Sequence, residues 1–184
     1  MLFVLTGPES CAKSSLATAL SEHFQGLYVE EVARRYLQGR LNYQPSDLLQ
    51  IAVLQQAEES AVVGDEVGHT MDGARESALA APTLVFADTD LQVIYIWWQE
   101  KYGAVPRCLT RAYANASPRH YLLCAPDIPW QADELRENPQ DRERLFALYK
   151  ADLEARGSAF TQIQGQGAER LSNAIEAVHQ AMVR

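Results

Sequence analysis

The chain has 184 residues, of which 47% are hydrophobic and 22% are charged. This size and composition are typical of one globular domain and argue against a disordered or fibrous protein. Acidic residues outnumber basic ones by 24 to 16, which gives a net charge of −8. An acidic chain without a basic stripe is a poor candidate for binding nucleic acid. The three widely spaced cysteines argue against a disulfide framework and indicate a reducing, cytoplasmic environment.

The opening residues 1–5 are too few for a signal peptide, and no apolar run reaches the ~20 residues that span a bilayer. We therefore expect neither a membrane partner nor a nucleic-acid partner, and the sequence makes no prediction of oligomeric state. Short apolar runs alternate with amphipathic stretches along the chain, as strands alternate with helices. In chain order, the pattern predicts strand 2–5, helix 13–24, strand 27–29, helix 31–41, a helix capped by Ser46, strand 83–87, helix 91–102, strand 120–125, helix 138–156, strand 159–163 and a closing helix over 171–182.

This alternation predicts an α/β fold with a five-stranded parallel sheet and helices on both faces, in a single domain over residues 1–184. The acidic, glycine-bearing segment 63–77 is expected to be a surface loop or a broken helix. Ligands of such sheets bind at the carboxyl ends of the strands. The residues that follow each strand are therefore the candidates for function: 6–14, 30–35, 88–90 and 125–136.

Residues 7–14 read Gly-Pro-Glu-Ser-Cys-Ala-Lys-Ser, which nearly matches the phosphate-binding pattern GxxxxGK[ST]. The Lys13 ammonium would reach the β- and γ-phosphates of ATP, and the Ser14 hydroxyl would bind Mg²⁺. Ala12 stands where glycine is expected and costs about 1–2 kcal/mol if the position requires a positive φ. The alternative is a tight turn with a solvated lysine. The residues expected to contact the nucleotide are Gly7, Glu9, Ser10, Cys11, Ala12, Lys13, Ser14 and Ser15.

Charged residues also follow the second and third strands. A carboxylate within 30–35 could accept the proton of a substrate hydroxyl as it attacks the γ-phosphate, with an arginine beside it for phosphate. Taken alone, that segment is more often a solvated helix start. Asp88 or Asp90 could hold Mg²⁺ or a ribose diol, whereas Asp88 or Thr89 could instead cap the next helix.

The segment 129–136 follows the fourth strand and carries Trp130 and Arg136. Such a segment could close over the site, with Arg136 neutralising the transferred phosphoryl group and Trp130 offering a face to a flat base. The alternative is a surface turn, and Arg142 and Arg144 on the next helix are more often solvated ion-pair partners. On the helix 91–102 we expect one of its two adjacent tryptophans to pack in the core and the other to face the site.

Four segments in this order resemble the ribosylnicotinamide kinase domain of NadR-type proteins: GPESCAKSSLA, EEVARRYL, FADTDLQVIYIWWQEKYG and YLLCAPDIPWQADELRENPQDRERLF. The resemblance runs from residue 2 to about 177, and about 62–80 fits least well. It implies a three-layer P-loop kinase fold and the use of Mg²⁺ and ATP to phosphorylate the 5′-hydroxyl of nicotinamide riboside. The adenylyltransferase and DNA-binding domains of the trifunctional members have no counterpart in this sequence, so we do not expect repression of transcription from it.

The resemblance also implies roles for single residues. Gly7, Lys13 and Ser14 match the ATP site of the family. Glu31 and Arg34 match its E-x-A-R motif, Asp88 and Asp90 its D-T-D motif, and Trp130, Asp133 and Arg136 its PW…D-x-LR motif. Two residues depart from the family pattern, Ala12 in the loop and Glu134, where glycine is usual.

Our first hypothesis is therefore an ATP- and Mg²⁺-dependent nucleoside kinase. Ser14 and Asp88 would bind the metal, and one of Glu31, Asp88 and Asp90 would activate the hydroxyl. The residues expected to contact the substrate are Arg34, Asp90, Trp98, Trp130 and Asp133. Ala12 and Glu134 motivate a second hypothesis, a nucleotide-binding pseudo-kinase that senses a nucleotide without turnover. A third keeps the kinase chemistry with a deoxynucleoside or a nucleoside monophosphate as acceptor.

Overall fold

A computed structural model describes residues 1–40, 42–68, 83–132 and 140–183 of the chain. Five strands and seven helices alternate along these residues, broadly as the sequence predicts. In chain order they are β1 Leu2–Thr6, α1 Lys13–Phe24, β2 Leu27–Val29, α2 Val32–Leu37, α3 Pro45–Gly68, β3 Val85–Asp88, α4 Leu91–Tyr102, α5 Arg107–Ala114, β4 His120–Cys124, α6 Arg142–Ala155, β5 Phe160–Ile163 and α7 Gly167–Met182.

Several helices differ from the prediction. Helix α2 ends at Leu37 instead of 41, and α7 begins at Gly167 instead of 171. Helix α5 was not expected, because only Leu109 and Tyr113 are buried along its eight residues. Helix α3 continues to Gly68, so the first part of the segment 63–77, expected as a surface loop or a broken helix, is helical. Helix α6 begins at Arg142, later than the expected start at 138. Within the described residues, no helix is both long enough and apolar enough to cross a membrane.

All strand pairs are parallel, and the strand order in the sheet is β2-β3-β1-β4-β5. The first strand is therefore central, with the later strands β3 and β4 on either side. Its end is level with theirs, since Leu5 pairs with Asp88 and Thr6 pairs with Leu123. The loop after β1 thus lies between the residues that follow β3 and those that follow β4, where such sheets bind ligands.

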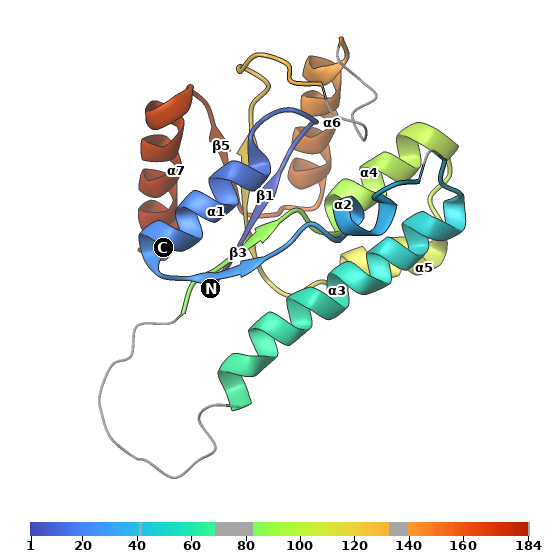
Figure 1. The fold of residues 1–184 in the computed structure, drawn as a ribbon, viewed down its shortest axis with the longest axis horizontal. Helices are drawn as coiled ribbons and strands as arrows, with labels where there is room; N and C mark the ends of the chain where they lie inside the picture. Colours follow the sequence, from blue (N-terminus) through green and yellow to red (C-terminus); the bar gives the residue numbers. More distant parts are fainter. Residues whose placement is uncertain (41, 69–82, 133–139, 184) are drawn as a thin grey trace.

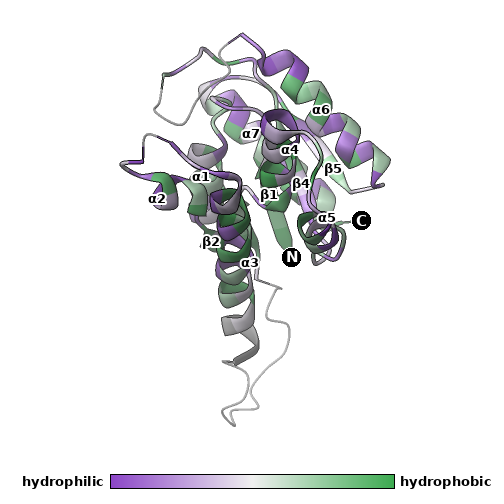
Figure 2. Ribbon diagram, turned by 90° about the vertical axis from the view of Figure 1, so that its right-hand side faces the viewer, coloured by the Kyte–Doolittle hydropathy of each residue, from purple (hydrophilic) through white to green (hydrophobic). Residues whose placement is uncertain are grey.

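Helices cover both faces of the sheet, with α1 and α7 on one side and α4 and α6 on the other (Figure 1). Along β1, Phe3 and Leu5 pack with α1 and α7, whereas Leu2 and Val4 pack with α4 and α6. Burial on both faces explains why the central strand β1 is apolar from Leu2 to Leu5, whereas the edge strand β5 is only partly buried and contains Thr161 and Gln162. Figure 2 shows β1 in hydrophobic colours, while hydrophilic and hydrophobic residues alternate along α6.

A third hydrophobic cluster lies among the helices beyond β2 and β3. It contains residues of α2, α3, α4 and α5, among them Leu37, Ile51, Ile94, Trp98 and Leu109. This cluster fixes α2 and α4 relative to the sheet. Both helices carry residues that face the loop after β1, so the cluster also sets the far wall of the cavity described next.

Candidate nucleotide-binding site

A cavity of about 420 Å³ opens at the carboxyl ends of the strands. The loop after β1 forms one wall, and side chains from α2, α4 and α6 form the others. It is lined by Gly7, Pro8, Glu9, Ser10, Cys11, Ala12, Lys13, Ser14, Ser15, Glu31, Ala33, Arg34, Val93, Ile96, Trp97, Glu100, Ile128, Gln131, Leu145 and Tyr149. All eight residues expected to contact a nucleotide thus meet in one cavity with Glu31 and Arg34.

Three residues of the loop have a positive φ, but only one of them, Gly7, is a glycine. Gly7 has φ 126, and a Cβ there would lie 2.7 Å from the carbonyl oxygen of Cys124, so this position requires glycine. Ser10 and Ala12 also have positive φ values, 51 and 62. Ala12 therefore does occupy the left-handed region, at a cost of about 1–2 kcal/mol for a residue with a side chain. Alternation of this kind forms an anion-binding concavity of backbone amides.

Lys13 begins α1 and folds back over the loop. Its ammonium donates to the carbonyl oxygens of Gly7 and Pro8 at 3.0 and 2.7 Å and lies 3.9 Å from the Cys11 sulfur. Burial acts to lower the pKa of Lys13, but Cys11 and the carboxylates of Glu31 and Asp88 outweigh it and raise the pKa. The lysine is thus charged at neutral pH and is held within the loop by carbonyl groups.

Asp88 ends β3 beside Ser14 and is 2% exposed. Burial raises the pKa of Asp88, against the opposing effects of a hydrogen bond with Ser14 and the charge of Lys13. Its Oδ1 is buried without a hydrogen-bond partner. A carboxylate oxygen without a partner next to a hydroxyl suits Mg²⁺, which usually keeps one or two carboxylates and fills its shell with water and phosphate. Among the described residues no group of three or more His, Cys, Asp or Glu could hold a metal.

Glu31 precedes α2 and lines the same cavity. Its carboxylate is 3.7 Å from the Arg34 guanidinium. A buried glutamine of α3 fixes the backbone on both sides of it, because the Gln55 amide donates to the Glu30 carbonyl and accepts from the Val32 N–H, at 3.1 and 2.9 Å. The sequence analysis gave Gln55 no role in the site. Its signal was a polar side chain on the apolar face of a helix.

Asp90 and Trp98 are both buried. Asp90 is 1% exposed and is fully engaged, because it caps α4 through the Gln92 N–H and accepts hydrogen bonds from Arg119 and Tyr121. Trp98 packs in the third cluster and donates to the Ala104 carbonyl. Trp97 lines the cavity instead. Neither Asp90 nor Trp98 lines this cavity, and their expected contacts with the substrate stay predictions.

The segment after β4 contacts the loop from the outside. The Gln131 N–H donates to the Ser10 hydroxyl at 2.8 Å, and half-buried Trp130 lies 5.8 Å from the Arg142 guanidinium. Arg142 donates to the carbonyl oxygens of Ser10 and Ile128, both at 3.0 Å. It is thus a loop contact rather than the solvated ion-pair partner we expected, while Arg144 is such a partner, of Glu100 and Asp141. The expected site residues Asp133 and Arg136, and Glu134, lie outside the described residues.

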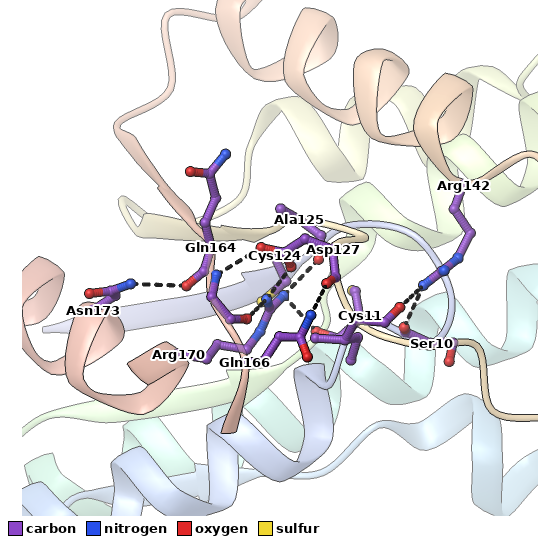
Figure 3. Close-up of polar contacts among 12 residues, drawn as sticks. Ser10, Cys11, Cys124, Ala125, Asp127, Arg142, Gln164, Gln166, Arg170 and Asn173 are labelled. Carbon is purple, nitrogen blue, oxygen red and sulfur yellow. Dashed lines mark hydrogen bonds and ion pairs between the residues drawn. The ribbon is translucent and has the colours of Figure 1, made fainter. Parts of the chain in front are cut away.

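Arg170 of α7 reaches the same loop from the other side (Figure 3). Its guanidinium donates to the carbonyl oxygens of Cys11 and Ala125 at 2.9 and 2.7 Å. It also donates to Gly165 O and pairs with Asp127. The sequence analysis did not single out Arg170. The available signal was its position on the helix face that also carries Ala174, Ala177, Val178 and Ala181, all buried.

A second hollow, of about 390 Å³, lies on the α7 side of the loop. The loop and the start of α1 thus lie between the two cavities. The second is lined by Ala12, Ser15, Leu16, Ala19, Ile128, Pro129, Gln131, Gln166, Gly167, Arg170 and Leu171.

Solved structures share this fold at low sequence identity, whereas no curated protein sequence matches the chain. NadR in complex with NAD and AMP-PNP has a TM-score of 0.70 at 19% identity, over 97% of this chain and 48% of that one. NadR in complex with NR has a TM-score of 0.71 at 17% identity, over 97% and 50%. Thymidylate kinase from Ehrlichia chaffeensis has a TM-score of 0.65 at 8% identity, over 98% of both chains. The chain therefore spans about half the length of the NadR chains.

The likeness to these structures shows a shared fold. A family model also matches most of the chain, from β1 to Arg170 of α7. The AAA domain family matches residues 2–170, so the chain belongs to the AAA domain family, with a five-stranded parallel sheet and a P-loop.

Proposed function

We propose that the protein is a kinase that transfers the γ-phosphoryl group of ATP to the 5′-hydroxyl of a nucleoside, with nicotinamide riboside as the preferred acceptor. The observation that carries the proposal is the common cavity of the P-loop and Glu31. The loop and the Glu31 carboxylate line this one cavity of about 420 Å³, which supports a reaction between a phosphate held by the loop and a hydroxyl next to Glu31. The kinase folds of the solved structures support the same reaction class.

The loop would hold the triphosphate of ATP. The concavity at Ser10 and Ala12 and the start of α1 favour anions. Lys13 would exchange the carbonyl oxygens of Gly7 and Pro8 for the β- and γ-phosphates. The adenine would occupy the second hollow, between Pro129 and Gly167, on the side of the loop away from Glu31.

Ser14 and Asp88 would hold Mg²⁺, because Asp88 Oδ1 is the buried carboxylate oxygen that has no partner. When bound, the ion would neutralise charge on the phosphates and orient them for transfer. The role of the chain's own residues is to keep Asp88 ionised next to Lys13 and to keep the Ser14 hydroxyl directed at the phosphates.

The acceptor would bind between the loop and α4. Trp97 and Tyr149 supply aromatic surface to a flat base, while the Glu100 carboxylate at the same wall is paired with Arg144. The aromatic surface favours a positively charged ring such as the pyridinium of nicotinamide riboside. Glu31 would take the proton of the 5′-hydroxyl as its oxygen bonds to the γ-phosphorus and the bond to ADP breaks. Arg34 would hold Glu31 or the transferred phosphate.

Two alternatives follow from specific observations. Ala12 has a strained backbone at a position where glycine is usual, which favours a sensor that binds a nucleotide without transferring its phosphate. The likeness to thymidylate kinase favours a nucleoside monophosphate as acceptor. Both keep the P-loop as the nucleotide site, so they differ from the main proposal in the reaction and in the acceptor only.

The test is incubation of the purified protein with Mg²⁺, ATP and a panel of nucleosides and nucleoside monophosphates, with the products resolved by mass spectrometry. We expect phosphorylation of nicotinamide riboside above the other acceptors. Glu31→Gln should lower kcat by about 10²–10⁴-fold, with ATP affinity preserved. Glu30→Gln is the matched control, because the Glu30 side chain is exposed and pairs with Arg35 instead. ATP binding without any phosphorylated product would support the sensor and overturn the kinase.

A further inference from the structure

The P-loop holds two residues with side chains in the left-handed region, Ser10 and Ala12. Residues in such conformations persist only where the surrounding structure over-determines them. In the usual pattern a glycine at the position of Ala12 would remove much of this strain. The loop must therefore be held in its shape by contacts from outside.

Two arginines supply these contacts, and both act on carbonyl groups of the strained segment. Arg142 donates to the carbonyl of Ser10 at 3.0 Å, and Arg170 donates to the carbonyl of Cys11, the residue before Ala12, at 2.9 Å. They approach from α6 and from α7, on opposite sides of the loop (Figure 3). Together they fix the peptide groups on both sides of Cys11.

Each arginine also donates to carbonyl groups outside the loop. Arg142 donates to the carbonyl of Ile128. Arg170 donates to Ala125 O, which follows β4, and to Gly165 O, which follows β5. One guanidinium thus ties the loop after β1 to the ends of two other strands, a geometry that the planar fork of arginine allows and the single ammonium of lysine does not.

In this position the Nε of Arg170 makes no hydrogen bond. Its side chain is 4% exposed, and its Nε is buried without a partner. Such a group costs free energy unless the rest of the side chain compensates. Its two terminal nitrogens donate to four acceptors, which belong to the loop and to the residues that follow β4 and β5.

We propose that Arg170, with Arg142, is a positioning residue that keeps this glycine-poor P-loop in its phosphate-binding shape. The proposal rests on the proposed function only in that the loop binds a triphosphate. It predicts that the loop needs Arg170 because position 12 is alanine. A glycine at position 12 should therefore make the arginine partly dispensable.

The test is a double-mutant cycle between positions 170 and 12, read out by calorimetric binding of Mg²⁺-ATP and of inorganic tripolyphosphate. Arg170→Lys and Arg170→Met should each weaken the binding of both ligands. The expected loss for Arg170→Met is about 5- to 30-fold, the factor that corresponds to the strain of one left-handed residue. Ala12→Gly should restore most of the loss in the Arg170 variants and change the affinity little in the wild type.

Tripolyphosphate separates loop positioning from a direct contact with the adenine, since Arg170 also lines the second hollow. The matched control is Arg119→Lys, which changes an equally buried arginine, 5% exposed, that pairs with Glu59 and Asp90 away from the loop. It should lower the melting temperature without weakening tripolyphosphate binding. In kinase assays, Arg170→Lys should raise the KM for ATP more than it lowers kcat.

Three results would overturn the proposal. One is unchanged tripolyphosphate affinity in both Arg170 variants despite lower stability. Another is loss of ATP affinity alone. The third is an Ala12→Gly effect of equal size with and without Arg170, which would mean that the two positions are not coupled.

If Arg170→Met does not fold, the cycle is complete with Arg170→Lys. Failure of the proposed function is distinguishable, because it would show as a wild-type protein that binds neither ligand, or that binds both and transfers no phosphate.

Discussion

Asp88 ends β3 and Asp90 stands two residues further along, at 2% and 1% exposure, but their surroundings differ. Asp90 belongs to a buried polar cluster of Asp90, Glu59, Arg119 and Tyr121, in which both its carboxylate oxygens accept hydrogen bonds. Asp88 faces the P-loop with one oxygen that has no partner. Between them Thr89 has φ 73, so the chain turns sharply and sends the two acids to different places.

The polar cluster around Asp90 and the P-loop region around Asp88 differ in the same way as the two acids. The polar cluster obeys the rules for a stable interior, since its charges are paired and hydrogen-bonded. The P-loop region departs from them, with an unpartnered carboxylate oxygen and two strained residues. Departures of this kind concentrate at functional sites, where the rest of the fold compensates for them. Asp90 thus has the surroundings of a residue that stabilises the fold, whereas Asp88 keeps an oxygen for the proposed ligand, although the sequence offers both as one motif.

The largest expected effect is on the polar cluster. Arg119→Met would leave the carboxylates of Glu59 and Asp90 buried without their cation, and breaking such a pair costs about 3–5 kcal/mol of unfolding free energy. Urea denaturation measures it. Arg144→Met is the contrast, because its ion pairs are half exposed, and loss of an exposed pair costs about 0–1 kcal/mol. Equal losses in the two variants would show that the cluster is no more than a surface network.

The next effect separates the two acids by activity. Asp88→Asn should lower kcat about 10²–10³-fold, because it removes the carboxylate proposed to hold Mg²⁺ and such charge stabilisation contributes several kcal/mol. Asp90→Asn should leave kcat nearly unchanged in the protein that remains folded. Steady-state assays at several Mg²⁺ concentrations decide between them. Full activity of Asp88→Asn would remove Asp88 from the metal site.

A smaller effect tests the strain in the loop. Ala12→Gly should raise the unfolding free energy by about 1 kcal/mol, since relief of ~1–2 kcal/mol of strain exceeds the ~0.4–1 kcal/mol of entropy that glycine adds to the unfolded chain. Ala19→Gly in α1 is the matched control. It should have the opposite sign and cost about 1 kcal/mol, as glycine does within a helix. Melting temperatures of both variants suffice, and a destabilised Ala12→Gly would contradict the strain at this position.

The sheet was predictable from the sequence because its central strands are apolar runs, and the P-loop because the spacing of its residues defines the pattern. The sequence also indicates that one tryptophan of α4 is buried. It does not show which one, so Trp98 was expected to face the substrate, because the rotation of a helix is set by its neighbours and not by its own residues. Gln55 and Arg170 act on carbonyl groups of distant segments, with acceptors 25 residues away for Gln55 and 159 for Arg170. No local pattern encodes such contacts, so the supports of the site became visible only in the fold.

The smallest effect concerns the pH dependence of Asp88. Burial raises the pKa of Asp88 above its ordinary value of 3.8 in the folded protein. The folded state then binds the proton more tightly than the unfolded state, so ionisation of Asp88 costs stability at neutral pH and this cost disappears as the pH falls. Asp88→Asn should therefore be more stable than the wild type at pH 7. The difference should shrink as the pH falls through the raised pKa toward 3.8.

Mg²⁺-ATP should abolish much of the difference by stabilising only the wild type, because the ion needs the ionised carboxylate. Denaturation curves across this pH range, with and without Mg²⁺-ATP, measure both effects. If Asp88→Asn is less stable than the wild type at pH 7, the oxygen proposed to bind the metal has a structural partner instead.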